Sequence, residues 1–101
     1  MIQVDILTPT EKIFSGLADS VSIDTRDGYI TILPDHAELV GLIDTGPIEI
    51  SVGKDLMVYV LVKGIFRVYE NKVKVMVLNL IKTEEVDMDE IRELKQWAEG
   101  I

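Results

Sequence analysis

Residues 20–33 read Ser-Val-Ser-Ile-Asp-Thr-Arg-Asp-Gly-Tyr-Ile-Thr-Ile-Leu, and this stretch decides the fold. In its first half, Val21 and Ile23 alternate with polar residues, the period-two pattern of a strand with one solvated face. The run from Tyr29 to Leu33 forms a second apolar segment. Asp-Gly at 27–28 is a strong hairpin signal, because Gly28 can adopt the positive φ that tight turns require. The stretch therefore predicts two antiparallel strands joined by a short turn.

Segments of the same kind recur on both sides of this hairpin. Ile2, Val4 and Ile6 alternate with polar residues, and Pro9 then ends the run because it donates no amide hydrogen bond. The other expected strands are 13–17, 39–43, 48–52, 56–62, 65–69 and 73–78. Eight to ten short strands without helices between them predict a mainly β fold, an antiparallel sandwich or barrel. We favour the sandwich.

Two of these strands break the alternation: Leu56 to Val62 is apolar at every position, and Val75 to Leu78 is nearly as apolar on both faces. In an antiparallel sheet this indicates that the outer face of each strand is covered as well as the inner one. The cover could be a terminal helix, a partner subunit or both. The pattern is the first indication of an interaction surface.

The composition changes after residue 83. Seven acids and two bases lie between Glu84 and Glu99, so this segment carries −5 of the net charge of −8. Four apolar residues follow at helical spacing: Ile91, Leu94, Ala98 and Ile101. We therefore expect two parts, a β-sandwich domain over 1–83 and a short C-terminal helix within 84–101.

Charge and composition exclude several classes of function. With 10 Lys and Arg against 18 Asp and Glu, the chain is a poor match for nucleic acid, whose binding depends on basic residues. The absence of Cys and the single His exclude thiol chemistry and the usual zinc sites, and we expect no metal. The longest apolar run, 56–62, is too short to cross a bilayer, so no direct membrane insertion is expected.

Candidate chemistry is equally scarce. His36 is the one imidazole, and its neighbours Asp35 and Glu38 are close only in sequence, which favours a loop or interface role over catalysis. The acids at 87–90 lack the later glycine and glutamate of a calcium loop, so helix capping is the favoured interpretation. The sequence therefore predicts a protein that is not an enzyme.

Several short motifs, in this order, resemble the epsilon subunit family of F-type ATP synthase, which also supplies the mitochondrial delta subunit. The matching residues are Phe14-Ser15-Gly16, Asp27-Gly28, Leu33-Pro34, His36-Ala37, Leu39, Gly46, Gly64, Met88-Asp89 and Arg92. The resemblance implies a ten-stranded sandwich followed by helix. It also implies a non-catalytic rotor subunit that binds the gamma subunit and the c ring, with transient contact to the alpha/beta hexamer. Such a subunit would lie peripherally at the cytoplasmic face of the bacterial cell membrane.

The resemblance also implies a partner interface for the c ring and gamma. Carried onto matching positions, it comprises Thr8, Tyr29, Ile30, Thr31, Leu33, Pro34, Asp35, His36 and Leu39. The chain departs from the family pattern at Tyr29, where an acid is common, at Asp35, where Gly is common, and at Glu38, where Pro is common. These departures affect individual contacts within the expected interface.

The family's nucleotide motif is only partly matched. Asp89 and Arg92 fit the ATP-contacting positions, but Glu93 stands where alanine is usual. Because the sequence ends at Ile101, one C-terminal helix is expected instead of two, with weak or absent ATP binding, little inhibition of ATP hydrolysis and no required cofactor. Asp89 and Arg92 are equally well explained as a cap and a surface pair three residues apart. The alternative to a rotor subunit is a free-standing β-sandwich module that binds a ligand or protein.

Overall fold

The computed structural model describes residues 1–83, which form seven strands and no helix. The strands are β1 (Ile2–Leu7), β2 (Lys12–Ala18), β3 (Ser20–Thr25), β4 (Gly28–Ile32), β5 (Leu39–Val52), β6 (Asp55–Tyr69) and β7 (Lys72–Thr83). They pair in the order β2-β1-β7-β6-β5-β3-β4. The mainly β fold is confirmed, and the expected C-terminal helix lies outside the described residues.

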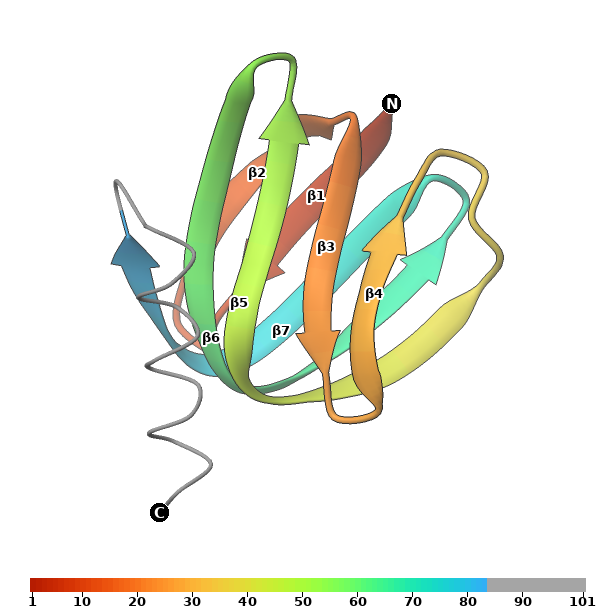
Figure 1. Cartoon of the computed structure of the whole chain (residues 1–101). Helices are drawn as coiled ribbons and strands as arrows, with labels where there is room; N and C mark the ends of the chain where they lie inside the picture. The colour runs from red at the N-terminus through yellow and green to blue at the C-terminus, as the bar shows by residue number, and fades with distance from the viewer. Residues whose placement is uncertain (84–101) are drawn as a thin grey trace.

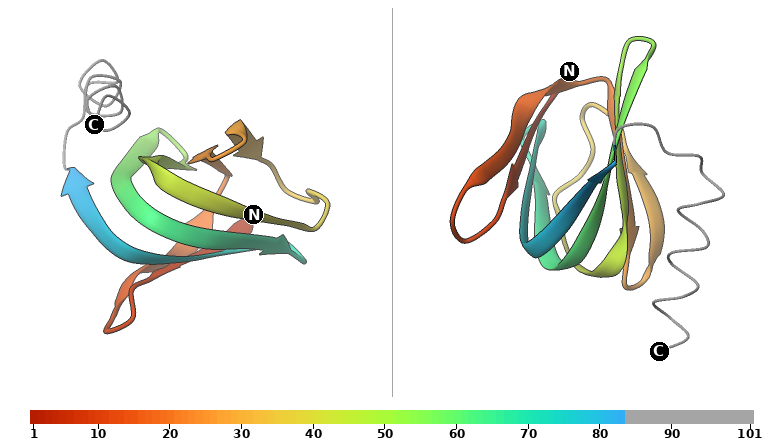
Figure 2. Two further views of the ribbon diagram at one scale, coloured as in Figure 1. Left: turned by 90° about the horizontal axis from the view of Figure 1, so that it is seen from below. Right: turned by 90° about the vertical axis from the view of Figure 1, so that its left-hand side faces the viewer.

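The three long strands bend, so that one continuous sheet makes two layers (Figures 1 and 2). The front layer contains β4, β3, the second half of β5, the first half of β6 and the second half of β7. The back layer contains β2, β1, the first half of β7, the second half of β6 and the first half of β5. This arrangement is the expected sandwich.

The resemblance implies ten strands and the structure has seven, because β5, β6 and β7 each run through both layers. Two of the breaks expected from the sequence, 45–47 and 63–64, are bends within β5 and β6. The sequence 45–47, Thr-Gly-Pro, was expected to separate two strands, but β5 runs through it with its pairing to β6 in the same register on both sides. The corner of β6 is at Lys63, which has a φ of 49°. Its neighbour Gly64 has no room for a side chain, since a Cβ there would lie 2.4 Å from the Met76 carbonyl oxygen. Counting each bent strand once in each layer reconciles the two descriptions.

A second difference is that one strand pair is parallel. β1 pairs with β7 in parallel, from Gln3 opposite Lys72 to Leu7 opposite Met76, whereas all other pairs in residues 1–83 are antiparallel as expected. Parallel neighbours need a long crossover connection. The five strands between β1 and β7 provide this connection. The pairing cannot be predicted from the alternation of apolar residues, because that pattern is local to each strand.

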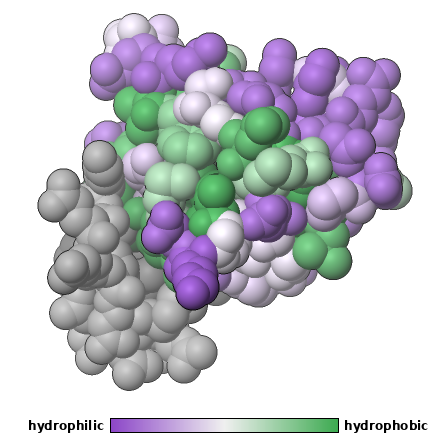
Figure 3. Space-filling view, turned by 90° about the horizontal axis from the view of Figure 1, so that it is seen from above, coloured by the Kyte–Doolittle hydropathy of each residue, from purple (hydrophilic) through white to green (hydrophobic). Residues whose placement is uncertain are grey.

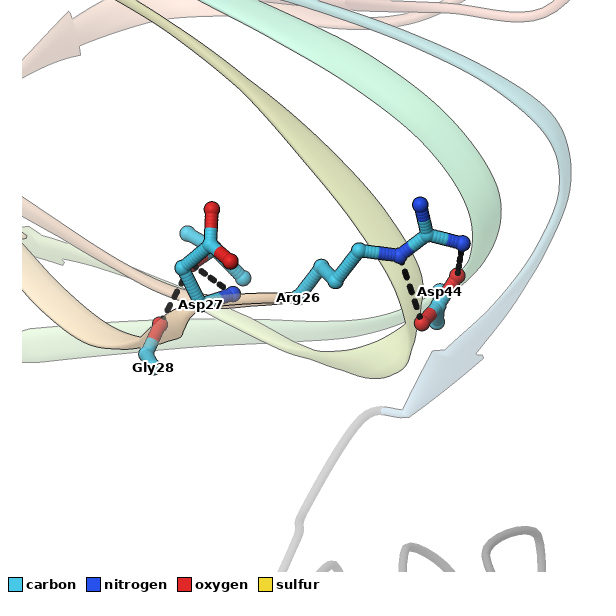
Figure 4. A network of polar contacts seen from close by, with 5 residues as sticks. Arg26, Asp27, Gly28 and Asp44 are labelled. Atoms are coloured by element: carbon cyan, nitrogen blue, oxygen red, sulfur yellow. Dashed lines mark hydrogen bonds and ion pairs between the residues drawn. The ribbon is translucent and has the colours of Figure 1, made fainter.

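The β3–β4 hairpin forms where the sequence predicts it. Thr25 pairs with Gly28 across a loop of two residues, and Gly28 has a positive φ of 134°. The Thr25 hydroxyl donates to the Gly28 carbonyl oxygen at 2.6 Å and accepts from the Asp27 amide at 3.1 Å. Figure 4 shows Arg26 reaching to both carboxylate oxygens of Asp44 at 3.3 Å. This exposed pair contributes at most about 1 kcal/mol, but it joins the turn to the corner of β5.

The core lies between the layers and follows the alternation in the sequence. Ile2, Val4 and Ile6 point inward from β1, and Phe66 points inward from β6. The prediction that residues 56–62 are covered on both faces is confirmed at their centre, because the four residues 58–61 are all buried. Residues 58–61 therefore belong to an inner strand of the front layer, between β5 and β7.

Candidate functional site

The β4–β5 loop, residues 33–38, is exposed along its whole length and holds four of the nine expected interface residues. The His36 amide donates to the Leu33 carbonyl oxygen at 3.2 Å, which closes the loop's first turn. Its imidazole Nδ1 lies 2.7 Å from the Ala37 carbonyl oxygen, and within residues 1–83 it is hydrogen-bonded to no carboxylate. This geometry fits the expected structural or interface role of His36. Hydrophilic side chains gather over this loop and the adjacent β6–β7 turn (Figure 3).

The loop is fastened to the β6–β7 turn by a reciprocal pair of hydrogen bonds. The Asp35 amide donates to Asn71 Oδ1 at 2.6 Å, and Asn71 Nδ2 donates to Asp35 Oδ1 at 3.2 Å. The Asn71 carbonyl oxygen also accepts from the Gln3 amide at 2.9 Å. We call this contact the Asp35–Asn71 clip. It joins three segments that are far apart in the sequence and lie side by side in Figure 1.

Both residues of the clip have left-handed backbone conformations. The φ of Asp35 is 65° and that of Asn71 is 59°. Asn and Asp tolerate this region better than other residues with a side chain. The conformation gives a physical reason for the glycine that resembling sequences carry at the position of Asp35.

The expected residues on β4 divide between its two faces. Tyr29 and Thr31 lie on the outer face of the front layer, where the Tyr29 hydroxyl donates to Glu49 Oε2 at 2.9 Å. Thr31 shares a hydrogen bond of 3.0 Å with Ser22. Ile30 instead packs partly buried against the core, as does Leu39 at the start of β5. These two apolar residues therefore lie mostly beneath the expected interface and form little of its surface.

Among the side chains of residues 1–81, Tyr29 is the one group whose pKa is clearly shifted. Burial raises the pKa of its phenol above the ordinary value of 10.0, opposed by the hydrogen bond with Ser22. The hydrogen bond to Glu49 and the negative charges of Glu49 and Asp24 raise this pKa further. The phenol is thus a neutral donor over the physiological range.

Thr8 lies apart from the other expected interface residues. It forms the β1–β2 turn, where its amide donates to the Glu11 carbonyl oxygen at 2.9 Å and its hydroxyl accepts from the Glu11 amide at 3.2 Å. β1 begins beside Asn71 and ends at Leu7, just before Thr8, so the length of a strand separates Thr8 from the clip. The structure does not bring Thr8 together with the loop.

A large apolar surface lies on the outer side of the back layer, and we call it the back face. The sequence analysis anticipated only its part on β7, where residues 75–78 are apolar at successive positions. Five of its side chains are between 46% and 69% exposed: Val40, Leu42, Ile65, Met76 and Leu78. Cross-strand register places Leu42, Ile65, Met76 and Leu7 in one row across four strands. A hollow of about 340 Å³ opens beside this row and is lined by residues that include Pro9, Ile65, Met76 and Leu78. Thr8 adjoins this end of the back face.

A group of cations at the other end of the back face was also missed. Arg67, Lys72 and Lys74 surround the ring of Tyr69, with Arg67 Cζ 4.2 Å from the ring centroid. We call this group the Tyr69 cluster. The alternation Lys-Val-Lys-Val at 72–75 is the signal that places these lysines on a solvated face, but only the sheet register brings Arg67 and Tyr69 beside them.

Other kinds of site are not found in the described part of the chain. No group of three His, Asp or Glu side chains in residues 1–83 is placed to hold a metal ion. The same residues include no helix with the length and apolar character needed to cross a membrane. What the geometry offers is an apolar sheet surface, a basic cluster and a fastened loop, which are features of protein recognition.

Residues 1–83 match the family described as "ATP synthase, Delta/Epsilon chain, beta-sandwich domain". The chain belongs to this family. An epsilon chain from Ruminiclostridium cellulolyticum is 30% identical over 96 residues, which cover 95% of this chain and 72% of that one. A chloroplastic epsilon chain from Panax ginseng is 27% identical over 95 residues, covering 94% and 68%. The resemblance stated from the motifs is thereby confirmed.

Solved structures share the fold. A chain of the Euglena gracilis mitochondrial ATP synthase, in a structure of OSCP, F1 and c-ring, superposes with a TM-score of 0.77 at 20% identity. The match covers 98% of this chain but only 64% of that one. A chain from the central stalk and c-ring of the Tetrahymena thermophila enzyme gives a TM-score of 0.68 at 14% identity.

Two expectations can now be placed. The ATP synthase delta and epsilon chains are non-catalytic stalk subunits, in agreement with the expectation that this chain is not an enzyme. The two expected ATP-contacting residues, Asp89 and Arg92, lie outside the described residues.

Proposed function

We propose that the chain is a central-stalk rotor subunit that binds the gamma subunit through the back face and the c ring through the β4–β5 loop. In this role it couples ion translocation to ATP synthesis without performing chemistry. The family match supports the assignment to the stalk. The two structural neighbours come from assemblies that contain a c-ring, which supports the choice of partners.

The observation that carries the gamma contact is the exposure of the back face. Large apolar side chains in one row across four strands are unfavourable in water, and an exposed apolar patch of this kind usually marks an interaction site. The back face extends from Thr8 and Pro9 at one end to Val40, just after the loop, at the other. One partner lying along it would contact both Thr8 and the end of the loop, so the expected interface residues need not form a single cluster.

The β4–β5 loop suits a contact with the c ring because it is exposed yet fastened. The Asp35–Asn71 clip limits the conformations of the loop, and a partner loses less conformational entropy when it binds a preorganised segment. Leu33, which is 57% exposed, and Pro34 provide an apolar tip beside the polar clip. On this proposal the chain is peripheral to the membrane, held there by its partners, with transient contact to the alpha/beta hexamer.

The proposal includes weak or absent ATP binding and little inhibition of ATP hydrolysis. Glu93 places a carboxylate next to the partly matched motif of Asp89 and Arg92, and a negative charge there opposes a phosphate. Calorimetric titration with ATP should show no micromolar binding. A micromolar dissociation constant would refute this part of the proposal.

The gamma contact is tested by size-exclusion chromatography of the full chain with the gamma subunit of the same ATP synthase. We expect co-elution, and we expect Met76→Asp to abolish it by placing a charge in the apolar row. Leu56→Asp is a matched control, because Leu56 is 53% exposed and Met76 52%, but Leu56 lies on the front layer. Wild-type chain that fails to co-elute, or equal losses in both variants, would contradict the proposed interface.

The alternative is a free-standing module with a ligand cleft along the doubly apolar strand. In the structure, the centre of that strand, residues 58–61, is buried on both faces. The hollow described above is lined by Pro9 and by residues from β6 and β7 beyond that segment. The rotor subunit is therefore the better supported function.

A further inference from the structure

The Tyr69 cluster concentrates positive charge on an acidic chain. Arg67 Cζ lies 4.2 Å from the centroid of the Tyr69 ring, Lys72 Nζ 5.7 Å and Lys74 Nζ 6.0 Å. Cations at these distances are attracted by the negative face of an aromatic ring. The sheet register places the three cations side by side, and the attraction to the ring offsets part of their mutual repulsion, so the cluster is a preformed basic site.

No acid in residues 1–81 forms an ion pair with the cations of this cluster. The one ion pair among the side chains of residues 1–81 joins Arg26 to Asp44, at the β3–β4 turn. The acid opposite Lys74 in the sheet is Asp5, whose carboxylate accepts from the Ser15 hydroxyl at 2.7 Å and forms no ion pair with Lys74. Residues 1–83 carry a net charge of −3, yet three of their eight basic residues are grouped here.

The cluster is continuous with the back face. Cross-strand register places Arg67 between Val40 and Lys74, in the row next to Leu42, Ile65 and Met76. Side chains two residues apart on a strand share a face, so Lys74 and Met76 both point outward. A partner that covers the apolar row therefore meets the cations at its margin, beside the β4–β5 loop.

We propose that the partner bound to the back face carries an acidic segment whose carboxylates bind Arg67, Lys72 and Lys74. The proposal rests on the proposed gamma contact and deepens it by stating the chemistry of the partner's complementary surface. A guanidinium stacked on a ring keeps its in-plane N–H groups free for a bidentate carboxylate. The apolar row then provides contact area, and the cluster fixes the orientation of the partner and speeds its association.

An acidic protein segment explains the surroundings of the cluster better than an anionic lipid surface does. The cations adjoin flat rows of side chains on a β-sheet, which match the shape of another protein. The adjacent loop and turn also carry acids, Asp35, Glu38 and Glu70, that a negatively charged membrane would repel. Discrete carboxylates can be placed to reach the cations and avoid these acids.

The test measures association of the full chain with the purified gamma subunit of the same ATP synthase by stopped flow or surface plasmon resonance. Lys72→Glu/Lys74→Glu should lower the association rate about tenfold at low ionic strength. The difference should shrink as salt is added, because exposed charges are screened. The apolar contacts are unchanged in this variant, so most of the free energy of binding to gamma should persist.

A matched control separates this effect from a general change in net charge. Lys74→Glu alone should lower the association rate. Lys54→Glu makes the same charge change in the β5–β6 turn, away from the back face, and should leave the association rate near that of the wild type. Equal rates for Lys74→Glu and Lys54→Glu, with wild-type binding intact, would overturn this inference but not the gamma contact.

Two further outcomes are decisive. Failure of the wild-type chain to bind gamma would remove the proposed function itself. Binding to vesicles of phosphatidylglycerol that is lost in Lys72→Glu/Lys74→Glu, with unchanged association with gamma, would assign the cluster to the membrane and overturn the inference.

Discussion

Replacing Gly41 by alanine tests how the core positions the strand that carries the back face. Gly41 lies in β5 between Val40 and Leu42, and its Cα faces the ring of Phe66, which is only 2% exposed. An added Cβ would lie 2.3 Å from Phe66 Cε1 and 2.4 Å from Cζ. These distances are more than 1 Å shorter than ordinary carbon contacts of about 3.5–4.0 Å, so the ring or the strand must move.

The expected cost follows from two opposing effects. Overpacking a core costs about 1–3 kcal/mol, while alanine in a strand is favoured over glycine by about 0.5–1 kcal/mol. We therefore expect Gly41→Ala to lower the free energy of unfolding by about 1–2 kcal/mol. In a domain of about 100 residues, each 1 kcal/mol corresponds to about 4–8 °C in melting temperature.

A double-mutant cycle identifies the contact responsible. Phe66→Leu removes the ring atoms nearest Gly41 and should cost about 1–2 kcal/mol by itself. In that background Gly41→Ala should become neutral or slightly stabilising, which gives a coupling energy of about 1–2 kcal/mol in urea unfolding followed by circular dichroism. Gly16→Ala is the control, since its Cβ would meet the half-buried Phe14 ring at 3.2 Å, where the ring can shift. Additive effects within about 0.5 kcal/mol would refute the reasoning.

Two further predictions concern the expected interface. Asn71→Gly keeps the left-handed backbone but removes the clip to Asp35. Amide hydrogen exchange in the loop should therefore become faster, and the free energy of unfolding should fall by about 1 kcal/mol. Unchanged exchange would show that the clip does not hold the loop. The pKa of Tyr29 is raised in the folded state, so its contribution to stability is fully present below pH 10 and is lost as the pH rises through the folded pKa. The difference in unfolding free energy between wild type and Tyr29→Phe should accordingly shrink above pH 10, and a constant difference would contradict the assigned environment.

The sequence predicts the parts of this fold that depend on local alternation. The inward-facing residues of β1, the β3–β4 hairpin with its positive φ at Gly28, and the doubly buried centre of β6 all follow from the spacing of apolar residues. The bends in β5 and β6 do not, because Gly46 and Pro47 equally suit a turn between two strands. The parallel pairing of β1 with β7 joins segments some 70 residues apart and leaves no local pattern.

The candidate site shows the same division. The expected residues of the loop were found from motifs, and the structure places all of those between 33 and 36 in one exposed segment. The back face was anticipated only at residues 75–78. On its other strands the outward apolar residues alternate with inward residues that are also apolar, so each of those strands resembles ordinary core. Only the register reveals that Leu42, Ile65 and Met76 form one row pointing outward.

Asp35 illustrates how a departure from a family pattern can be compensated within one chain. A glycine at this position would adopt a φ of 65° without steric cost but would leave the loop mobile. Asp35 adopts the same φ at some cost, and its carboxylate gains a hydrogen bond from Asn71 that glycine could not accept. Asp35→Gly should therefore relieve backbone strain while loosening the loop, whereas Asp35→Asn keeps a side-chain oxygen able to accept from Asn71. If the clip preorganises the loop for docking, Asp35→Gly should bind the c ring more weakly than Asp35→Asn does. This difference in affinity should remain even if the two variants unfold at the same urea concentration, because preorganisation acts on binding separately from global stability.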